Sequence, residues 1–432
     1  MQPDHASPVL SESEIHSLPK VLLHDHLDGG LRPATIIELA QECGYTELPT
    51  TDPEELESWF YTAASSGSLP KYLETFKHTC AVMQTALALR RVAREAVIDL
   101  SRDNIVYAEL RFAPEQHLED GLSLQDVVDA VTDGLREGME LVDNEWGIEA
   151  RLILCGMRHS NRTAEIAQLT VDNYHQDSLV VGFDIAGAED GFPPSQHAEA
   201  FQLLRENFVP FTIHAGEAAG VESLESAVRQ GTLRIGHGVR MFEDFHAVIN
   251  GLATGPMSSY VRDRRIALEM CPTSNLQTGI VDDYADYPLP MLREMGFCCT
   301  VNTDNRLVSG TTLTREMMIL VDYFGFEEAE LFDLTKNAIE NAFAPWFLRR
   351  IILEKIILPA YQARQFAQME EFSRDALGMV GDDEDYNVDD LNFDLSMLED
   401  LGINLSDLGI GADDGPVELP PSEDQEDGDN KK

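Results

Sequence analysis

Two histidines, His24 and His26, lie one residue apart at the end of the apolar run KVLLHDH, and Asp28 follows them. In an extended strand, residues i and i+2 point to the same side of the backbone, so both imidazoles face one space. Such a pair can ligate a metal. Taken alone, the spacing favours the interpretation that both histidines are ordinary polar residues at the mouth of a strand. A metal site therefore requires further ligands elsewhere in the chain.

Residues of metal-ligating types end three other apolar segments. His214 ends VPFTIH and is followed three residues later by Glu217, His237 ends LRIGH, and Asp304 ends CCTVNTD. Imidazoles combined with a carboxylate form a donor set that suits zinc, with a water completing the shell. Zinc would lower the pKa of that water to about 7 and provide hydroxide at neutral pH.

The elements that must position these residues are eight short, apolar, β-rich segments that alternate with helical stretches. The segments are 20–24, 105–112, 149–155, 179–186, 209–215, 233–238, 265–271 and 296–304. The alternation predicts an α/β fold, and eight repeats of it favour a (β/α)8 TIM barrel over an open sheet.

In such a barrel, catalytic residues come from the C-terminal ends of several strands. Four of the twelve histidines and one aspartate fall at that end of four predicted strands. This joint pattern is much stronger evidence for a metal site than any one residue. The fourth segment and the residues after it, LVVGFDIAGAE, contain no lysine that could be carbamylated to bridge a second metal. We therefore expect one metal ion.

Helical patterns support the barrel and suggest an elaboration of it. They cover residues 35–43, 86–103, 124–142 and 223–230. About 80 residues separate the first two predicted strands, far more than an ordinary connection, so we expect extra helices there that overhang the catalytic end as a lid. After the barrel, residues 334–372 predict two closing helices broken near Pro345.

The charge of the chain limits its partners. The formal net charge is −46, which argues against binding to nucleic acids or anionic membranes. No basic region followed by an apolar run begins the sequence, and no stretch of about 18 apolar residues follows, so we expect a soluble, cytoplasmic protein. The six cysteines have no Cys-x-x-Cys spacing, and we expect them to be reduced and buried.

The acidity is concentrated at the C-terminal end. Residues 376–432 contain 18 acidic and 2 basic residues and carry −16, which leaves −30 for residues 1–375. We therefore expect a barrel domain over residues 1–375 and an acidic, disordered, low-complexity tail over 376–432. The stretch at 386–410 alternates acidic and apolar residues, a composition able to fold on an unknown partner. A solvated tail without a partner is the favoured alternative.

Six motifs carry a resemblance to a known family. The runs LLHDHLDGG, GFDIAGAE, TIHAGE, IGHG, CPTSN and VNTDN occur in this order within residues 18–360. They resemble the ordered signature of adenosine deaminase, in the metal-dependent deaminase branch of the amidohydrolase superfamily. The resemblance implies hydrolysis of adenosine, and of 2'-deoxyadenosine, to inosine and ammonia by a zinc-activated water in purine metabolism.

The resemblance also implies a role for each residue of the site. One zinc ion would be bound by His24, His26, His214 and Asp304. Glu217 would protonate the purine ring nitrogen, and His237 would orient and stabilise the attacking hydroxide. Gly187 would offer its backbone to the purine, and Asp28 would accept a hydrogen bond from a ribose hydroxyl. A helix N-terminal carboxylate is the alternative interpretation of Glu217.

Two features leave the substrate pocket open to alternatives. Where the family commonly has a second aspartate and then proline, this chain has Asn305 and Arg306. An asparagine amide can donate to purine N7 without the protonation that a carboxyl requires, although the change puts base specificity in question. The segment SLPKYLETFKHTC resembles the family's lid helix, with an apolar cover from Leu69, Tyr72, Leu73 and Phe76. The same spacing is also that of any amphipathic helix packed on a barrel.

Three other functions compete with adenosine deamination. The cytosine-type zinc deaminases use His-x-Glu with Pro-Cys-x-x-Cys, and the second motif is missing here. Relatives that act on free adenine or on a modified adenine nucleoside such as aminodeoxyfutalosine usually have glutamate at the position of Asp28, so the HLDGG form favours adenosine. A catalytically silent barrel acting through its tail would be expected to lack a ligand or Glu217, and none is missing.

Overall fold

The computed structural model describes residues 10–175, 177–249 and 251–366. Its central strands form two four-stranded parallel sheets with the orders β1-β2-β3-β4 and β10-β9-β6-β5. The strands are β1 (Lys20–His26), β2 (Ile105–Phe112), β3 (Glu149–Met157), β4 (Val180–Ala186), β5 (Thr212–Ala215), β6 (Arg234–His237), β9 (Ala267–Met270) and β10 (Cys299–Val301). Each corresponds to one of the eight predicted segments.

Two parallel bridges join the half-sheets into a closed ring. Phe183 of β4 pairs with Phe211 before β5, and Asp25 of β1 pairs with Asp304 after β10. At the second bridge, the His26 amide donates to the Asp304 carbonyl at 2.7 Å, and the Asp304 amide donates to the His24 carbonyl at 3.0 Å. The predicted (β/α)8 barrel is confirmed, and candidate metal ligands make the backbone hydrogen bonds that close it.

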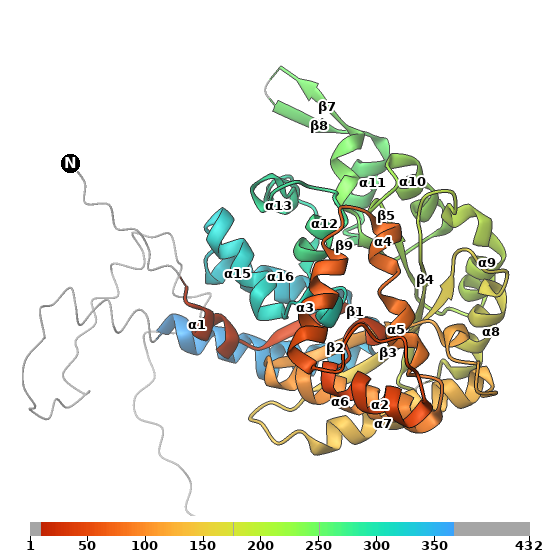
Figure 1. Ribbon diagram of the computed structural model, residues 1–432. Helices are drawn as coiled ribbons and strands as arrows, with labels where there is room; N and C mark the ends of the chain where they lie inside the picture. Colours follow the sequence, from red (N-terminus) through yellow and green to blue (C-terminus); the bar gives the residue numbers. More distant parts are fainter. Residues whose placement is uncertain (1–9, 176, 250, 367–432) are drawn as a thin grey trace, which may run out of the picture. The chain divides into compact units, whose positions relative to one another are not determined.

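Helices surround this ring (Figure 1). The longer ones are α6 (Ala86–Arg102), α7 (Leu124–Leu141), α8 (Thr163–Asn173), α9 (Ala198–Glu206), α10 (Val221–Gln230), α11 (Pro256–Asp263), α15 (Leu313–Phe324) and α16 (Glu328–Asn341). Shorter ones are α1 (Glu12–Ser17), α12 (Pro272–Gln277), α13 (Leu289–Glu294) and α14 (Arg306–Ser309).

The sequence sets both the start of α7 and its packing. Ser123 and Asp126 form a capping box, which satisfies two free amides at the start of the helix. Gly134 and Gly138 face α6, and a Cβ on Gly134 would lie 2.2 Å from the Arg90 carbonyl oxygen. The two helices that precede β2 and β3 can therefore pack with their backbones close together.

The insertion between β1 and β2 contains α2 (Pro33–Cys43), α3 (Pro53–Ala64), α4 (Leu69–Leu73) and α5 (Phe76–Ala81) before α6. Figure 1 shows α3, α4 and α5 in red to orange in front of the barrel strands. The predicted extra helices are confirmed. The single lid helix expected over SLPKYLETFKHTC is instead two short helices, because the helical hydrogen bonding is interrupted between Leu73 and Phe76.

The chain after the barrel also follows the prediction. Helix α16 ends at Asn341, and α17 (Trp346–Ile352) begins after Pro345 and continues through a π-helical turn, Leu353–Ile357, to residue 366. The two closing helices are thus broken at Pro345, as expected. The predicted tail at 376–432 lies outside the described residues.

One element was not expected from the sequence. An antiparallel hairpin, β7 (Phe245–Val248) and β8 (Gly251–Thr254), lies in the connection between β6 and α11 and stands apart from the barrel strands in Figure 1. Within residues 10–366, apart from the two omitted positions, no helix combines the length and the apolar character needed to cross a membrane.

Candidate active site

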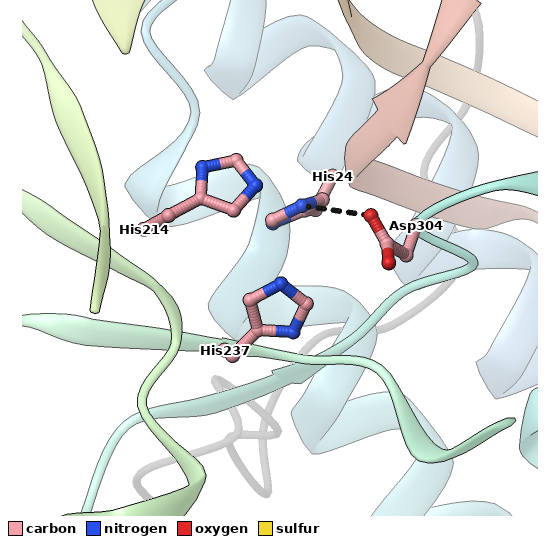
Figure 2. A group of neighbouring side chains, drawn as sticks. All are labelled: His24, His214, His237 and Asp304. Atoms are coloured by element: carbon pink, nitrogen blue, oxygen red, sulfur yellow. Dashed lines mark ion pairs between the residues drawn. The ribbon is translucent and has the colours of Figure 1, made fainter. Parts of the chain in front are cut away.

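Three of the predicted metal ligands gather with His237 at one end of the barrel. His24 comes from β1, His214 from β5, His237 from β6 and Asp304 from the residues after β10, and one ligand atom from each lies within 4.8 Å of the others. Figure 2 shows the three imidazoles around a common space with the Asp304 carboxylate at its edge. His24 Nε2 is 3.3 Å from Asp304 Oδ1.

His26 lies beside this group. Its Nε2 is 3.2 Å from His214 Nε2 and 3.4 Å from Asp304 Oδ1. The structure therefore groups three predicted ligands with His237, and it places the fourth, His26, next to two of them. Burial lowers the pKa of both His26 and His237 well below the usual range, so both rings are neutral and able to offer a lone pair at neutral pH.

Buried carboxylates hold two of the histidines in place. His24 Nδ1 is 2.9 Å from Glu269 of β9, and His214 Nδ1 is 2.7 Å from Asp184 of β4. A carboxylate on Nδ1 fixes the ring tautomer and leaves Nε2 free for a ligand. The carboxylate oxygen beside the buried His24 Nε2, at 3.3 Å, belongs to Asp304, another candidate ligand. The arrangement thus has the form of a prepared metal site.

Two arginines inside the barrel fix these carboxylates in turn. Arg111 of β2 donates to Asp184 at 2.6 Å and to Glu269 at 2.9 Å. Arg234 of β6 donates to Glu269 at 2.5 Å and to Glu109 at 2.6 Å. All five side chains are fully buried. A charged network therefore runs along the barrel interior to the Nδ1 atoms of two candidate ligands.

Glu217 lies in the loop after β5, and another carboxylate organises that loop. Glu189 accepts hydrogen bonds from the backbone amides of residues 216–219 at 2.7–3.0 Å. Glu217 Oε2 is 3.6 Å from His237 Nε2. Burial, with the nearby charges of Asp304 and Glu189, raises the pKa of Glu217 well above its usual range. A carboxyl group that keeps its proton at neutral pH can act as a general acid.

The backbone at His237 and Asp304 is unusual. Their φ angles are +62° and +59°, a left-handed conformation that costs energy for residues other than glycine and concentrates at functional sites. Asn275 Nδ2 is 3.1 Å from His237 Nδ1, so the amide can donate to this nitrogen and orient the ring. A Cβ on Gly236 would lie 3.2 Å from the His24 ring, so glycine makes room for the imidazoles.

A pocket of about 320 Å³ opens onto these groups. The metal candidates His26, His214, His237 and Asp304 line it together with Glu217, Asp28, Gly187, Asn305 and the four lid residues Leu69, Tyr72, Leu73 and Phe76. Burial raises the pKa of Asp28 to about 7, and Asp28 Oδ1 has no hydrogen-bond partner. The structure thus places every predicted substrate-binding residue on one cavity.

Tyr72 makes a polar contact that its expected role as apolar cover does not include. Its hydroxyl accepts a hydrogen bond from Asn305 Nδ2 at 2.9 Å and lies 2.8 Å from Ser309 Oγ. Asn305 Oδ1 is buried without a partner. Asn305, which stands where the family commonly has aspartate, is therefore hydrogen-bonded to helix α4. One of its two amide N–H groups is already used in this contact.

Several residues that support the site had no role predicted from the sequence. Asp184, Glu269, Glu109 and Arg111 lie within strands that are buried along their whole length, and Glu189 was quoted in a motif without a role. Their charge could have identified them, because an ionised side chain inside an apolar strand must find a partner. Four of the six cysteines are buried as expected, but Cys43 is exposed and Cys80 is partly exposed at the pocket.

The fold and the site together define a class of enzyme. A parallel barrel with histidines and an aspartate converging at the C-terminal ends of its strands, beside a buried carboxylic acid and a pocket, is the arrangement of a metal-dependent amidohydrolase. The sequence pattern of the family described as adenosine deaminase matches residues 19–359. The chain belongs to this family and is a hydrolytic deaminase.

Relatives in this family match most of the chain. Adenosine deaminase 1 of Streptomyces coelicolor is 51% identical over 362 residues, 83% of this chain and 91% of that protein. The adenosine deaminase of Mycobacteroides abscessus is 50% identical over 350 residues, 80% of this chain and 96% of that protein.

Solved structures of two other deaminases and of an amidohydrolase share the barrel. An adenine deaminase from Arthrobacter aurescens has a TM-score of 0.68 at 25% identity and covers 79% of this chain and 98% of its own. An Arabidopsis N6-mAMP deaminase has the same TM-score at 26% identity, covering 80% and 99%. An amidohydrolase from Burkholderia ambifaria, solved with bound Zn, shows the same fold with a TM-score of 0.72 at 23% identity, covering 84% and 97%.

Proposed function

We propose that this protein is a zinc enzyme that hydrolyses adenosine, and also 2'-deoxyadenosine, to inosine and ammonia. The observation that carries the proposal is the joint placement of a buried His/Asp cluster and a carboxylic acid on one pocket. The relatives at about 50% identity named adenosine deaminase support adenosine over the other purine substrates.

The donor set fits zinc. Imidazoles and one carboxylate at the mouth of a barrel match its preference for nitrogen and oxygen ligands with one position left for water. His24, His26, His214 and Asp304 would hold the ion, and its contribution when bound would be a water molecule acidic enough to be a nucleophile at neutral pH. The buried Nε2 of His24, whose neighbouring carboxylate at 3.3 Å is Asp304, another of the four ligands, supports this assignment.

The chain's own side chains would manage the protons. Glu217, kept protonated by its buried position, would give its proton to the ring nitrogen beside the carbon that is attacked. His237 would orient the attacking oxygen, because its ring faces Glu217 on one side and is fixed by Asn275 on the other. Departing ammonia needs a further proton, which the same pair of side chains could supply.

The pocket walls would bind the nucleoside. Gly187 would present its backbone to the purine edge, and Asn305 would donate its remaining amide hydrogen to N7. Asp28 would accept a hydrogen bond from a ribose hydroxyl with its unpartnered Oδ1. Leu69, Leu73 and Phe76 would cover the base. The ribose contact would satisfy Asp28 Oδ1, a buried oxygen that otherwise has no hydrogen-bond partner.

A substrate panel tests the proposed function. Purified protein would be given adenosine, 2'-deoxyadenosine or adenine, and the ultraviolet absorbance change would be followed with chelator-treated protein as control. We expect rapid formation of inosine or deoxyinosine that is lost after chelation and restored by zinc. Faster turnover of adenine, or no turnover of adenosine by metal-loaded protein, would contradict the proposed substrate.

We also propose that residues 376–432 are an appendage to the catalytic domain at 1–375. The function could instead reside in an interaction of the acidic tail with an unknown partner, with the barrel catalytically silent. Deletion of residues 376–432 separates these possibilities: turnover of adenosine should remain within experimental error of the full chain. A large loss of activity in a folded, metal-loaded deletion protein would give the tail a catalytic role.

A further inference from the structure

A second group of metal-ligating side chains lies at the pocket. Asp28 follows β1 in a short 3-10 turn, Cys80 lies near the end of α5, and His117 follows β2. One ligand atom from each lies within 4.8 Å of the other two. Asp28 and Cys80 line the substrate pocket. None of the three belongs to the His/Asp cluster that is the proposed zinc site.

Two of these side chains carry buried acceptors without partners. His117 is fully buried, and Asp28 is 6% exposed. Neither His117 Nε2 nor Asp28 Oδ1 has a hydrogen-bond partner. Buried polar atoms are almost always satisfied, so two unsatisfied atoms in one group require an explanation.

The tautomer of His117 shows which kind of partner is missing. Its Nδ1 is 3.1 Å from the Met83 carbonyl oxygen, which can only accept, so Nδ1 carries the hydrogen and Nε2 carries a lone pair. Burial lowers the pKa of His117 to about 4, which keeps the ring neutral. A neutral imidazole fixed through Nδ1 by a backbone carbonyl is the arrangement of a metal-binding histidine.

The three groups match the preference of a divalent transition metal. A carboxylate, a thiolate and an imidazole together suit zinc and its neighbours, whereas magnesium and calcium prefer oxygen ligands alone. The thiol of Cys80 would lose its proton to solvent when the metal binds. The thiolate and the Asp28 carboxylate would then carry two negative charges that balance the divalent ion. Solvent in the pocket would complete the coordination shell.

We propose that Asp28, Cys80 and His117 form a second, inhibitory binding site for a divalent transition metal ion such as zinc. The inhibition rests on the proposed function, in which Asp28 accepts a hydrogen bond from the ribose. An ion at this site occupies that carboxylate and the adjacent wall of the pocket. Metal and nucleoside therefore compete for the same space.

Cobalt(II) provides a probe that does not depend on turnover. The His/Asp cluster contains no sulfur, so a thiolate-to-cobalt charge-transfer band in the near ultraviolet reports only a site with a cysteine ligand. Full-length protein already loaded with one equivalent of zinc would be titrated with Co²⁺ under a non-chelating reductant. We expect the band to appear and to saturate at one added equivalent.

Matched variants identify the ligands. Cys80→Ser and His117→Gln should abolish the band, and both replacements preserve approximate size so that the fold is retained. Cys155→Ser is the control, because Cys155 is buried and lines the same pocket but lies outside the group. Absence of the band in the parent protein, or its persistence in Cys80→Ser, would overturn the site.

Kinetics test the inhibitory role separately. Excess Zn²⁺ should raise the apparent KM for adenosine of the parent protein, and the concentration needed should increase at least ten-fold in Cys80→Ser but not in Cys155→Ser. Equal inhibition of both variants would overturn the inhibitory role even if cobalt binds. If the protein does not deaminate adenosine at all, the proposed function fails while the cobalt titration still decides whether the site exists.

Discussion

The barrel interior beneath the histidines and the pocket above them both contain charged residues, but they differ in how those charges are matched. In the interior, Arg111 and Arg234 form ion pairs with Glu109, Asp184 and Glu269 at 2.5–2.9 Å. In the pocket, Asp28 Oδ1 and Asn305 Oδ1 are buried without hydrogen-bond partners. Each interior carboxylate has an arginine partner, and Arg111 Nε is the network atom left without a hydrogen bond, whereas the pocket leaves two acceptor oxygens open to a ligand.

The contrast assigns different tasks to the two regions. A buried ion-pair network gives little net stability relative to apolar packing, but it fixes side-chain positions, and here it ends on the rings of two candidate ligands. The pocket carries the pKa shifts that chemistry can use, with Glu217 raised and His237 lowered. Substitutions in the interior should affect folding first, and substitutions in the pocket should affect turnover first.

The largest effect is expected in the pocket. Glu217→Gln should lower kcat by about 10²–10⁴-fold, because the amide cannot transfer a proton to the purine ring. Metal content, measured by atomic spectroscopy, should not change. Glu222→Gln is the control, since Glu222 is exposed in the first turn of α10. A Glu217→Gln protein with full metal and near-normal kcat would remove Glu217 from the mechanism.

The interior is tested by Arg234→Met. Removing this cation leaves Glu109 and Glu269 buried with one partner fewer, so the free energy of unfolding should fall by about 3–5 kcal/mol. Denaturant unfolding of metal-loaded protein measures the change. Arg229→Met breaks an exposed i,i+4 pair with Glu225 and should cost at most about 1 kcal/mol. Similar stabilities for the two variants would contradict the view that the interior network is structurally essential.

The pH dependence of stability provides a further test of the difference between the two regions, because one buried carboxyl has no arginine partner. Glu316 of α15 accepts hydrogen bonds from Thr273 N and Thr311 Oγ1, and no ion pair joins it to a cation in the part of the chain described here. Burial raises its pKa from 4.5 to about 7. The folded protein therefore holds a proton that the unfolded chain releases, and this group's stabilising contribution is lost as the pH rises from 4.5 to 7.

Glu316→Gln should remove this pH dependence. Relative to the variant, the parent protein should lose on the order of 3 kcal/mol of unfolding free energy between pH 4.5 and pH 7, with little further change above. Glu294→Gln, at an exposed position, should show a difference that does not vary with pH. A constant difference between the parent and Glu316→Gln proteins would show that the buried carboxyl does not retain its proton.

The smallest effect is expected where the lid meets the pocket. Tyr72→Phe removes the hydrogen bonds that join α4 to Asn305 and Ser309. A hydrogen bond of this kind contributes about 1 kcal/mol, so KM for adenosine should rise roughly five-fold while kcat changes little. Tyr61→Phe, at a side chain that is 44% exposed, is the control. An unchanged KM would show that Tyr72 acts only as the apolar cover expected from the sequence.

Much of this molecule could be predicted from particular sequence segments. The run KVLLHDH predicted a strand ending in two histidines, and β1 ends at His26. The eight β-rich segments predicted the barrel, and the long gap before β2 predicted extra helices. The prediction of a single lid helix was wrong in detail, because the amphipathic spacing does not show that the helix is interrupted between Leu73 and Phe76. The β7–β8 hairpin was missed altogether.

The sequence by itself determined the barrel and the convergence of His24, His26, His214, His237 and Asp304. Parallel strands in a barrel share one C-terminal end, so residues at strand ends must meet whatever the details of packing. Only the tertiary structure decided their partners: Glu269 on His24, Asp184 on His214, Tyr72 on Asn305, and the group of Asp28, Cys80 and His117. Those contacts join residues distant in sequence, and they depend on strand register, helix position and rotamer, which no local spacing encodes.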